Sequence, residues 1–281
     1  MKDKKFLGLI TRCKDEFFVA EFCNYYLKQG VDEINIIDDN SDDKSIYDTL
    51  VNNKNINIFY EKNITKKNYF SNWINILREK YEWVIYVDVD EFVVTKKNIN
   101  KTIRNELKTT FAETHCVKVP WVFMSCNSLE KNPKSILNEI TSRWNHDKKH
   151  PHTISKFRCR YDSIEIKSIF KPKYFNEIST VAGKDHHPHG HIGTANKIRD
   201  GVSNHPSELN PFYDNLREVD IETGFLLCYH YRIISKENCE KKLKLNDWYS
   251  DKSRGYTLQH LLSSDYSEVK DETLKKKENL K

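Results

Sequence analysis

The first 95 residues alternate apolar runs with amphipathic runs, and this alternation is the strongest constraint on the fold. The apolar runs predict strands, and the runs between them predict helices. Strands are expected at 6–11, 31–43, 56–61 and 83–94, and helices at 15–30, 44–52 and 68–81. Strands and helices that alternate in short units form a parallel sheet with helices on both faces. We therefore expect an α/β fold whose ligands lie beyond the carboxyl ends of the strands.

The remaining sequence is less regular. Apolar runs at 115–125 and 163–172 predict two more strands, and 224–250 reads as a strand followed by a helix that Ser235 caps. The end of the chain, 268–281, is highly charged and is expected to be a frayed tail. A chain of 281 residues is long enough for one large α/β domain, which we place at 1–267.

Composition and missing motifs exclude several classes of protein. The net charge of +5 comes from 46 basic and 41 acidic residues that are scattered along the chain, which is a poor footprint for nucleic-acid binding. The sequence lacks the G-x-x-x-x-G-K-[ST] and G-x-G-x-x-G motifs of nucleotide-binding loops. Seven dispersed cysteines without a C-x-x-C pair favour reduced thiols. With no apolar stretch of membrane-spanning length, we expect a soluble, cytoplasmic protein.

The run WVIYVDVDEFVV, residues 83–94, places three carboxylates inside an apolar strand. Period-two alternation puts Tyr86, Asp88 and Asp90 on one face of that strand. Two carboxylates so close together repel, unless one is protonated, a basic side chain pairs with them, or a divalent cation binds. Oxygen ligands select Mg²⁺ or Mn²⁺, which in turn can bridge a diphosphate. The alternative is a strand end with solvated acids and an arginine partner.

Three segments together resemble the GT-A glycosyltransferases, in particular the family 2-like and family 92-like group. They are TRCKDEFFVAEFCNYYLKQGVDEINIIDDNSDD, WVIYVDVDEF and LCYHYRIISKENCEKKL. The resemblance implies a Rossmann-like, mostly parallel central sheet, with a nucleotide-binding half at 1–97 and an irregular acceptor half at 98–267. It implies transfer of a sugar from a UDP- or GDP-sugar to a hydroxyl of a glycan, a lipid-linked glycan or a protein. It also implies Mn²⁺ or Mg²⁺ as cofactor.

The resemblance also implies roles for individual residues. Asp88 and Asp90 match the D-x-D that holds the metal and the diphosphate, and His230 matches a late histidine that completes the metal shell. On the nucleotide side, the matching positions are Thr11, Arg12, Glu16, Asp38 and Asp39. Lys167 lies where the group commonly keeps a basic residue, and it is expected to contact a phosphate of the nucleotide. One departure is Asp15, which stands where the group usually has asparagine.

Other candidates remain open. Arg232 and Lys241 could reach phosphates, and Trp121, Trp144 and Trp248 could stack on sugar rings or belong to the core. For an inverting reaction, the general base is predicted to be Asp185, ahead of Glu139, Asp147 and Asp162.

The histidine-rich stretch HHPHGH suggests one rival function. It contains His186, His187, His189 and His191, which predict either a lid or acceptor loop or the centre of a zinc metallohydrolase. A non-catalytic nucleotide- or glycan-binding module is a second rival. The basic surface could also make peripheral contact with a membrane.

Overall fold

The computed structural model describes residues 4–61, 69–150, 164–178, 188–189, 196–244 and 256–280. The strands are β1 (Lys5–Cys13), β2 (Glu33–Asp39), β3 (Ile56–Glu61), β4 (Tyr81–Tyr86), β5 (Glu91–Val94), β6 (Cys116–Ser125), β7 (Ser142–Arg143), β8 (Ile164–Phe170), β9 (Glu177–Ile178), β10 (Pro188–His189), β11 (Ile198–Asp200), β12 (Phe212–Tyr213), β13 (Leu227–His230) and β14 (Val269–Lys270). The α-helices are α1 (Val19–Lys28), α2 (Ile74–Lys80), α3 (Ile103–Lys108), α4 (Ile136–Glu139), α5 (Glu218–Thr223), α6 (Lys236–Lys244), α7 (Leu258–Leu262) and α8 (Thr273–Glu278). Short 3₁₀ helices are η1 (Ser45–Tyr47), η3 (Tyr69–Trp73) and η5 (Pro172–Tyr174).

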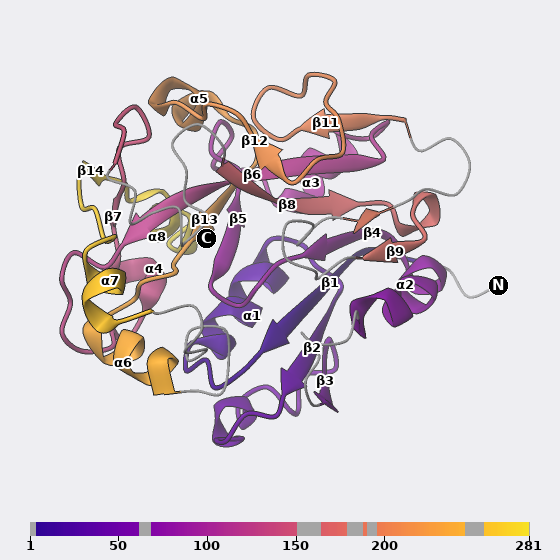
Figure 1. Ribbon diagram of the computed structural model, residues 1–281. Helices are drawn as coiled ribbons and strands as arrows, with labels where there is room; N and C mark the ends of the chain where they lie inside the picture. Colours follow the sequence, from indigo (N-terminus) through magenta and orange to yellow (C-terminus); the bar gives the residue numbers. More distant parts are fainter. Residues whose placement is uncertain are drawn as a thin grey trace.

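A central sheet organises the molecule (Figure 1). Strands β3, β2, β1 and β4 lie side by side in that order, and all three pairings are parallel. The sheet continues through β8, which runs antiparallel to both β4 and β6. On its far side, β6 pairs in parallel with β11 and β13. The predicted α/β fold with a parallel first half is confirmed.

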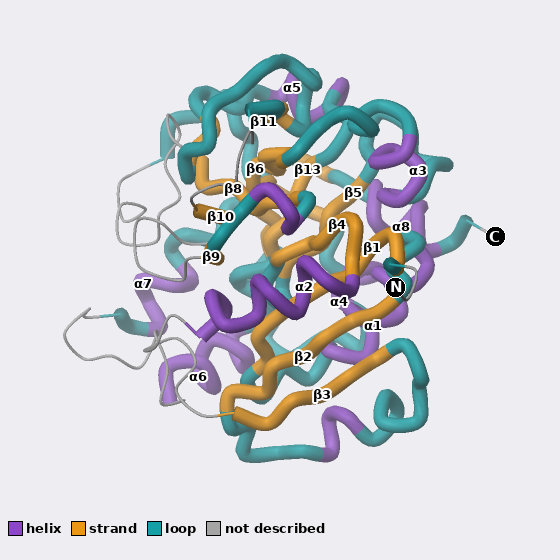
Figure 2. Tube along the Cα trace, turned by 90° about the vertical axis from the view of Figure 1, so that its right-hand side faces the viewer, coloured by secondary structure: helices purple, strands orange, loops and turns teal. Residues whose placement is uncertain are grey.

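Helices cover both faces of the parallel strands (Figures 1 and 2). Leu9 of β1 belongs to the apolar cluster that includes Phe22 of α1, whereas its neighbour Ile10 belongs to the cluster that includes Leu77 of α2. Side chains of a strand point alternately to the two faces, so the two clusters are the two sides of one sheet. The apolar faces predicted for residues 15–30 and 68–81 are therefore buried, as expected.

The predicted strand at 83–94 is wrong in its second half. Strand β4 ends at Tyr86, a turn follows, and β5 begins at Glu91 and pairs with β13 instead of continuing β4. In the turn, the amide of Glu91 donates to the carbonyl of Asp88 over 3.1 Å. The alternation that placed Asp88 and Asp90 on one strand face therefore does not hold beyond Tyr86.

The end of the chain is not a frayed tail. Val269–Lys270 form β14, which pairs with β7, and helix α8 follows it. Leu274 is buried, and Lys277 donates to the hydroxyl of Thr95 over 2.7 Å. The charged composition misled the prediction because several of these charges have buried partners in the body of the protein.

In the part of the chain that the structure describes, no helix combines the length and the apolar character needed to cross a membrane.

Candidate functional site

The turn between β4 and β5 brings together side chains from distant parts of the chain. The amide of Asp88 donates to Oε2 of Glu91 over 2.7 Å, which holds the Glu91 carboxylate under the turn. Strand β13 pairs His230 with Glu91, and the amide of Tyr231 donates to the carbonyl of Asp90 over 2.8 Å. These backbone contacts position the imidazole of His230 beside the two acids.

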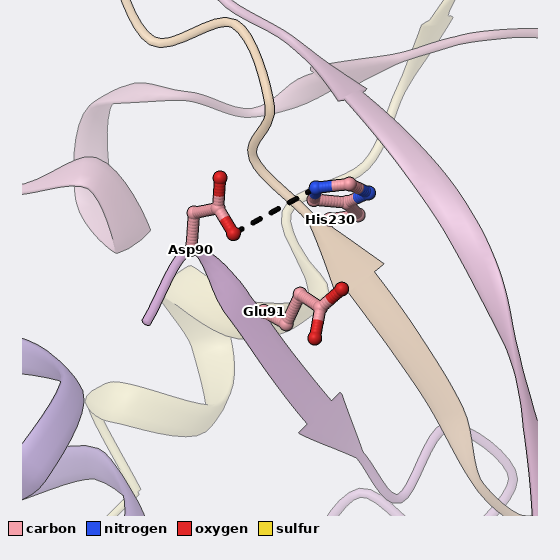
Figure 3. Close-up of side chains that lie close together, drawn as sticks. All are labelled: Asp90, Glu91 and His230. Atoms are coloured by element: carbon pink, nitrogen blue, oxygen red, sulfur yellow. Dashed lines mark ion pairs between the residues drawn. The ribbon is translucent and has the colours of Figure 1, made fainter. Parts of the chain in front are cut away.

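Asp90, Glu91 and His230 could hold a metal ion. One possible ligand atom from each of the three lies within 4.8 Å of the other two, and Nε2 of His230 is 3.7 Å from Oδ1 of Asp90. Figure 3 shows the carboxylates of Asp90, in the turn, and Glu91, in β5, on the same side as the imidazole of His230 in β13. Oε1 of Glu91 is buried and has no hydrogen-bond partner; Nδ1 of His230 also has none, but it lies on the side of the ring away from Asp90. Buried polar atoms normally have partners, and two oxygens with one imidazole nitrogen suit Mn²⁺, so these residues fit a divalent cation.

Two lysines from other elements neutralise these acids. Lys167 of β8 is fully buried, and its Nζ lies 2.8 Å from Oδ2 of Asp88 and 3.0 Å from Oε2 of Glu91. Lys242 of α6 is also buried, and its Nζ lies 3.3 Å from Oδ2 of Asp90. The carboxylates of the apolar run are therefore paired with basic side chains, and the partners found among the described residues are lysines, whereas the alternative interpretation named an arginine.

The pKa shifts follow from burial and from these pairings. Burial lowers the pKa of the Lys167 ammonium, but Asp88 and Glu91 outweigh it and raise this pKa. Burial of Asp90 is outweighed in turn by Lys242 and His230, which hold the pKa of its carboxyl group well below the usual range. For Glu91, burial dominates and raises the pKa of the carboxyl group against the effect of Lys167. Burial lowers the pKa of His230, so its imidazole is neutral, as a metal ligand must be.

The residues predicted on the nucleotide side lie at the carboxyl ends of β1 and β2. Oδ2 of Asp39 accepts from Nε and NH2 of Arg12, over 3.0 and 2.8 Å. The Thr11 side chain is buried, and its hydroxyl donates to the carbonyl of Arg12. Glu16 follows β1 and lies 4.0 Å from Nζ of Lys242, so this group adjoins the metal-ligand candidates. Their predicted contacts with a nucleotide stay predictions.

Asp38 is enclosed by the protein itself. Its carboxylate accepts from the Tyr47 hydroxyl over 2.7 Å, from the amide of Ser41 and from the ammonium group of Lys44. Burial raises the pKa of the Asp38 carboxyl group, but these hydrogen bonds outweigh burial and lower the pKa below its usual value. The geometry therefore assigns Asp38 to holding the acidic turn, and its predicted contact with a nucleoside remains untested.

Asp15 also holds the acidic turn in place. Its backbone has a positive φ of 53°, and its Oδ1 accepts from the amides of Asp42 and Asp43 over 2.8 and 3.0 Å. An asparagine would offer the same acceptor oxygen, which gives a physical reason why either residue suits this position.

Other sequence candidates have structural contacts or fall outside the described residues. Trp121 and Trp144 are buried, and the Trp121 ring lies 4.4 Å from the ring of His230, so both belong to the core around the site. Nζ of Lys241 donates to the carbonyl of Asp15 over 2.9 Å, and Arg232 is buried. Six further candidates lie outside the described residues: Asp162, Asp185, His186, His187, His191 and Trp248. The side chain of His189 also lies outside them.

Sequence reasoning missed two residues of this site. The resemblance gives Glu91 no role, and no sequence pattern points to Lys242. For Glu91, the available signal was its place directly after the D-x-D. Lys242 had no comparable signal, because nothing local distinguishes it from the other lysines of α6.

Comparison with known proteins identifies no family. No family model matches the chain, and no curated protein matches it. Among solved structures, it is similar to residues 1–349 of S. aureus TarS in complex with UDP, with a TM-score of 0.42, 12% identity, and coverage of 88% of this chain and 68% of that chain. It is also similar to GalNAc-T7 with UDP, GalNAc and Mn²⁺, with a TM-score of 0.39, 10% identity, and coverage of 89% and 50%. A third is a 4-diphosphocytidyl-2C-methyl-D-erythritol synthase from Anaerococcus prevotii, with a TM-score of 0.36, 14% identity, and coverage of 78% and 96%. At these TM-scores the likeness carries no argument about activity.

Proposed function

We propose that this protein is a metal-dependent glycosyltransferase of the GT-A type, which moves a sugar from a UDP- or GDP-sugar to a hydroxyl acceptor. The observation that carries the proposal is the group of Asp90, Glu91 and His230 beyond the end of β4. Ligands of open α/β sheets bind at this edge, and the buried Oε1 of Glu91, which has no hydrogen-bond partner, suits a divalent cation. The acceptor would be a glycan, a lipid-linked glycan or a protein.

Each residue would have a distinct task. Asp90, Glu91 and His230 would hold Mn²⁺ or Mg²⁺, and Asp88 would bind the ribose or join the metal shell. When bound, the ion would neutralise charge on the departing diphosphate. Thr11, Arg12, Glu16, Asp38 and Asp39 would form or support the nucleoside side.

An inverting reaction would also need a general base, for which Asp185 remains the candidate.

The test is binding of nucleotide sugars with and without metal. Thermal unfolding and isothermal titration would be measured with UDP- and GDP-sugars, in Mn²⁺ and in chelator. We expect at least one nucleotide sugar to raise the unfolding temperature only with metal, and Asp90→Asn to abolish the rise. Asp214→Asn, which changes an exposed aspartate, is the matched control and should behave like the wild type.

Two results would contradict the proposal. One is equal binding of the nucleotide sugar in chelator or in Asp90→Asn. The other is stoichiometric zinc in the purified protein with no binding of any nucleotide sugar, which would favour the metallohydrolase instead.

A further inference from the structure

We propose that Lys167 is a built-in counter-ion that neutralises Asp88 and one oxygen of Glu91, so that the site takes a single divalent cation on Asp90, Glu91 and His230. This inference rests on the proposed function and deepens it, since it gives the buried lysine beside the acidic run a role in the metal site. It makes Lys167 a positioning residue, because its ammonium group acts on the site through the two acids that it contacts.

The side chain of Lys167 is completely buried. Its side chain has 0% exposure, so a nucleotide could not reach its ammonium group. The only role that this burial leaves for the charge is inside the protein. Its Nζ lies 2.8 Å from Asp88 and 3.0 Å from Glu91, both distances of direct ion pairs.

The strand pairing fixes the position of Lys167. In the register of the sheet, Ser168 of β8 lies opposite Tyr86, the last residue of β4. Lys167 therefore stands directly beside the turn that holds the acids, on a rigid strand paired on both sides by β4 and β6. A side chain so placed fixes the two carboxylates it contacts.

Three other buried lysines behave differently from Lys167 and Lys242. The ammonium groups of Lys118, Lys171 and Lys277 donate to carbonyl, amide or hydroxyl oxygens. The ammonium group of Lys167 instead lies between two carboxylates, those of Asp88 and Glu91.

The two carboxylate oxygens of Glu91 have different surroundings. Oε2 of Glu91 accepts from the amide of Asp88 and contacts Lys167, while Oε1 is buried without a partner. One oxygen of Glu91 is thus used inside the protein and the other is left for a ligand. Asp88 belongs to the Lys167 side of this division, and Asp90 with His230 to the ligand side.

The test compares Mn²⁺ binding by the wild type, Lys167→Met and Lys118→Met. Lys118→Met is the matched control, because it removes a buried lysine from the neighbouring strand β6 whose partners are neutral oxygens. Bound Mn²⁺ would be counted by electron paramagnetic resonance, and thermal unfolding would be followed with Mn²⁺ and with chelator. No turnover is needed.

We expect Lys167→Met to unfold at a lower temperature than the wild type in chelator, and Mn²⁺ to restore its unfolding temperature. We also expect it to bind Mn²⁺ about tenfold more tightly, or to bind a second ion, because the positive charge that contacts Asp88 and Glu91 is gone. Lys118→Met should lose stability equally with and without metal. Unchanged or weaker Mn²⁺ binding by Lys167→Met would overturn the inference.

If Lys167→Met does not fold in chelator, the double variant Asp88→Asn/Lys167→Met tests the inference instead. It removes one charge of each sign, so we expect it to fold without metal and to bind Mn²⁺ within about twofold of the wild type. Loss of Mn²⁺ binding in the double variant would make Asp88 a metal ligand and would overturn the inference.

The outcomes separate the inference from the proposed function. A wild type that binds Mn²⁺ as expected but binds no nucleotide sugar would leave the inference standing and refute the proposed function. Absence of Mn²⁺ binding by the wild type and by Lys167→Met would refute both.

Discussion

The carboxylate of Asp271 is predicted to be one of the most important charges for stability. It lies between β14 and α8, and its side chain is 2% exposed. Oδ2 accepts from Nε of Arg143 over 2.9 Å and from the hydroxyl of Tyr229 over 2.8 Å. Oδ1 accepts from the amide of Thr273 over 3.0 Å. The same carboxylate therefore joins the chain end to the strand that carries His230.

The cost of Asp271→Ala can be worked out from these contacts. The Arg143 side chain is 1% exposed. Removal of one partner of a buried ion pair costs about 3–5 kcal/mol, because the remaining buried charge has lost its partner. Arg143 keeps Glu218, which accepts from both NH groups over 2.7 Å. We therefore expect the lower end, a loss of about 3 kcal/mol in the free energy of unfolding.

Urea unfolding at pH 7 would measure this loss as a shift of the transition midpoint. Asp271→Asn, which keeps the size and one acceptor oxygen, should lose less than Asp271→Ala. The control is Glu272→Ala, because the neighbouring carboxylate is partly exposed and pairs with the exposed Lys270, and no measurable loss is expected there. A loss below about 1 kcal/mol for Asp271→Ala would refute the reasoning, since it is no more than a typical single hydrogen bond contributes.

Three further predictions concern the parallel half of the sheet. Two lysines and a tyrosine outweigh burial and lower the pKa of Glu33 from 4.5 to about 2, so its ion pairs stabilise the fold fully above pH 4.5 and are lost as the pH falls toward 2. Glu33→Gln should remove about 1 kcal/mol of this acid-dependent stability, after allowance for the exposed lysines, and unfolding curves from pH 6 to 2 would show it. Gly30→Ala should cost more than about 1 kcal/mol in urea, because φ is 87° and the added Cβ would lie 2.7 Å from that of Arg104; an unchanged midpoint would contradict this. Asp15→Ala should cost about 2 kcal/mol by loss of an acceptor for two amides, whereas Asp15→Asn should stay near the wild type, and equal losses in urea would count against the acceptor role.

The parts of the fold that the sequence predicts are those with local periodicity. Phe22 and Leu77 fall on apolar helical faces, and both are buried on opposite sides of the sheet. Runs such as 116–125 and 164–170 are apolar enough to form interior strands, and they do. In these segments, each residue's environment follows from its neighbours in sequence, so a pattern is sufficient.

The candidate site is only partly predictable for the opposite reason. His230 and Asp90 could be placed together only through resemblance to a family, because 140 residues separate them in sequence. The break in the strand after Tyr86 depends on a hydrogen bond from the Asp88 amide to Glu91, and on β13 arriving to pair with β5. Period-two alternation cannot detect a turn that such contacts stabilise.

The acids of the apolar run are tolerated because their partners come from far along the chain. Lys167 lies 79 residues after Asp88, and Lys242 lies 152 residues after Asp90. Before β8 and α6 dock, burial of these carboxylates would leave charges without partners, which is strongly unfavourable. The ion pairs of the site therefore require both β8 and α6 to be in place. Its charge balance is consequently a property of the tertiary fold, and a divalent cation would enter a site whose shape the two lysines have already set.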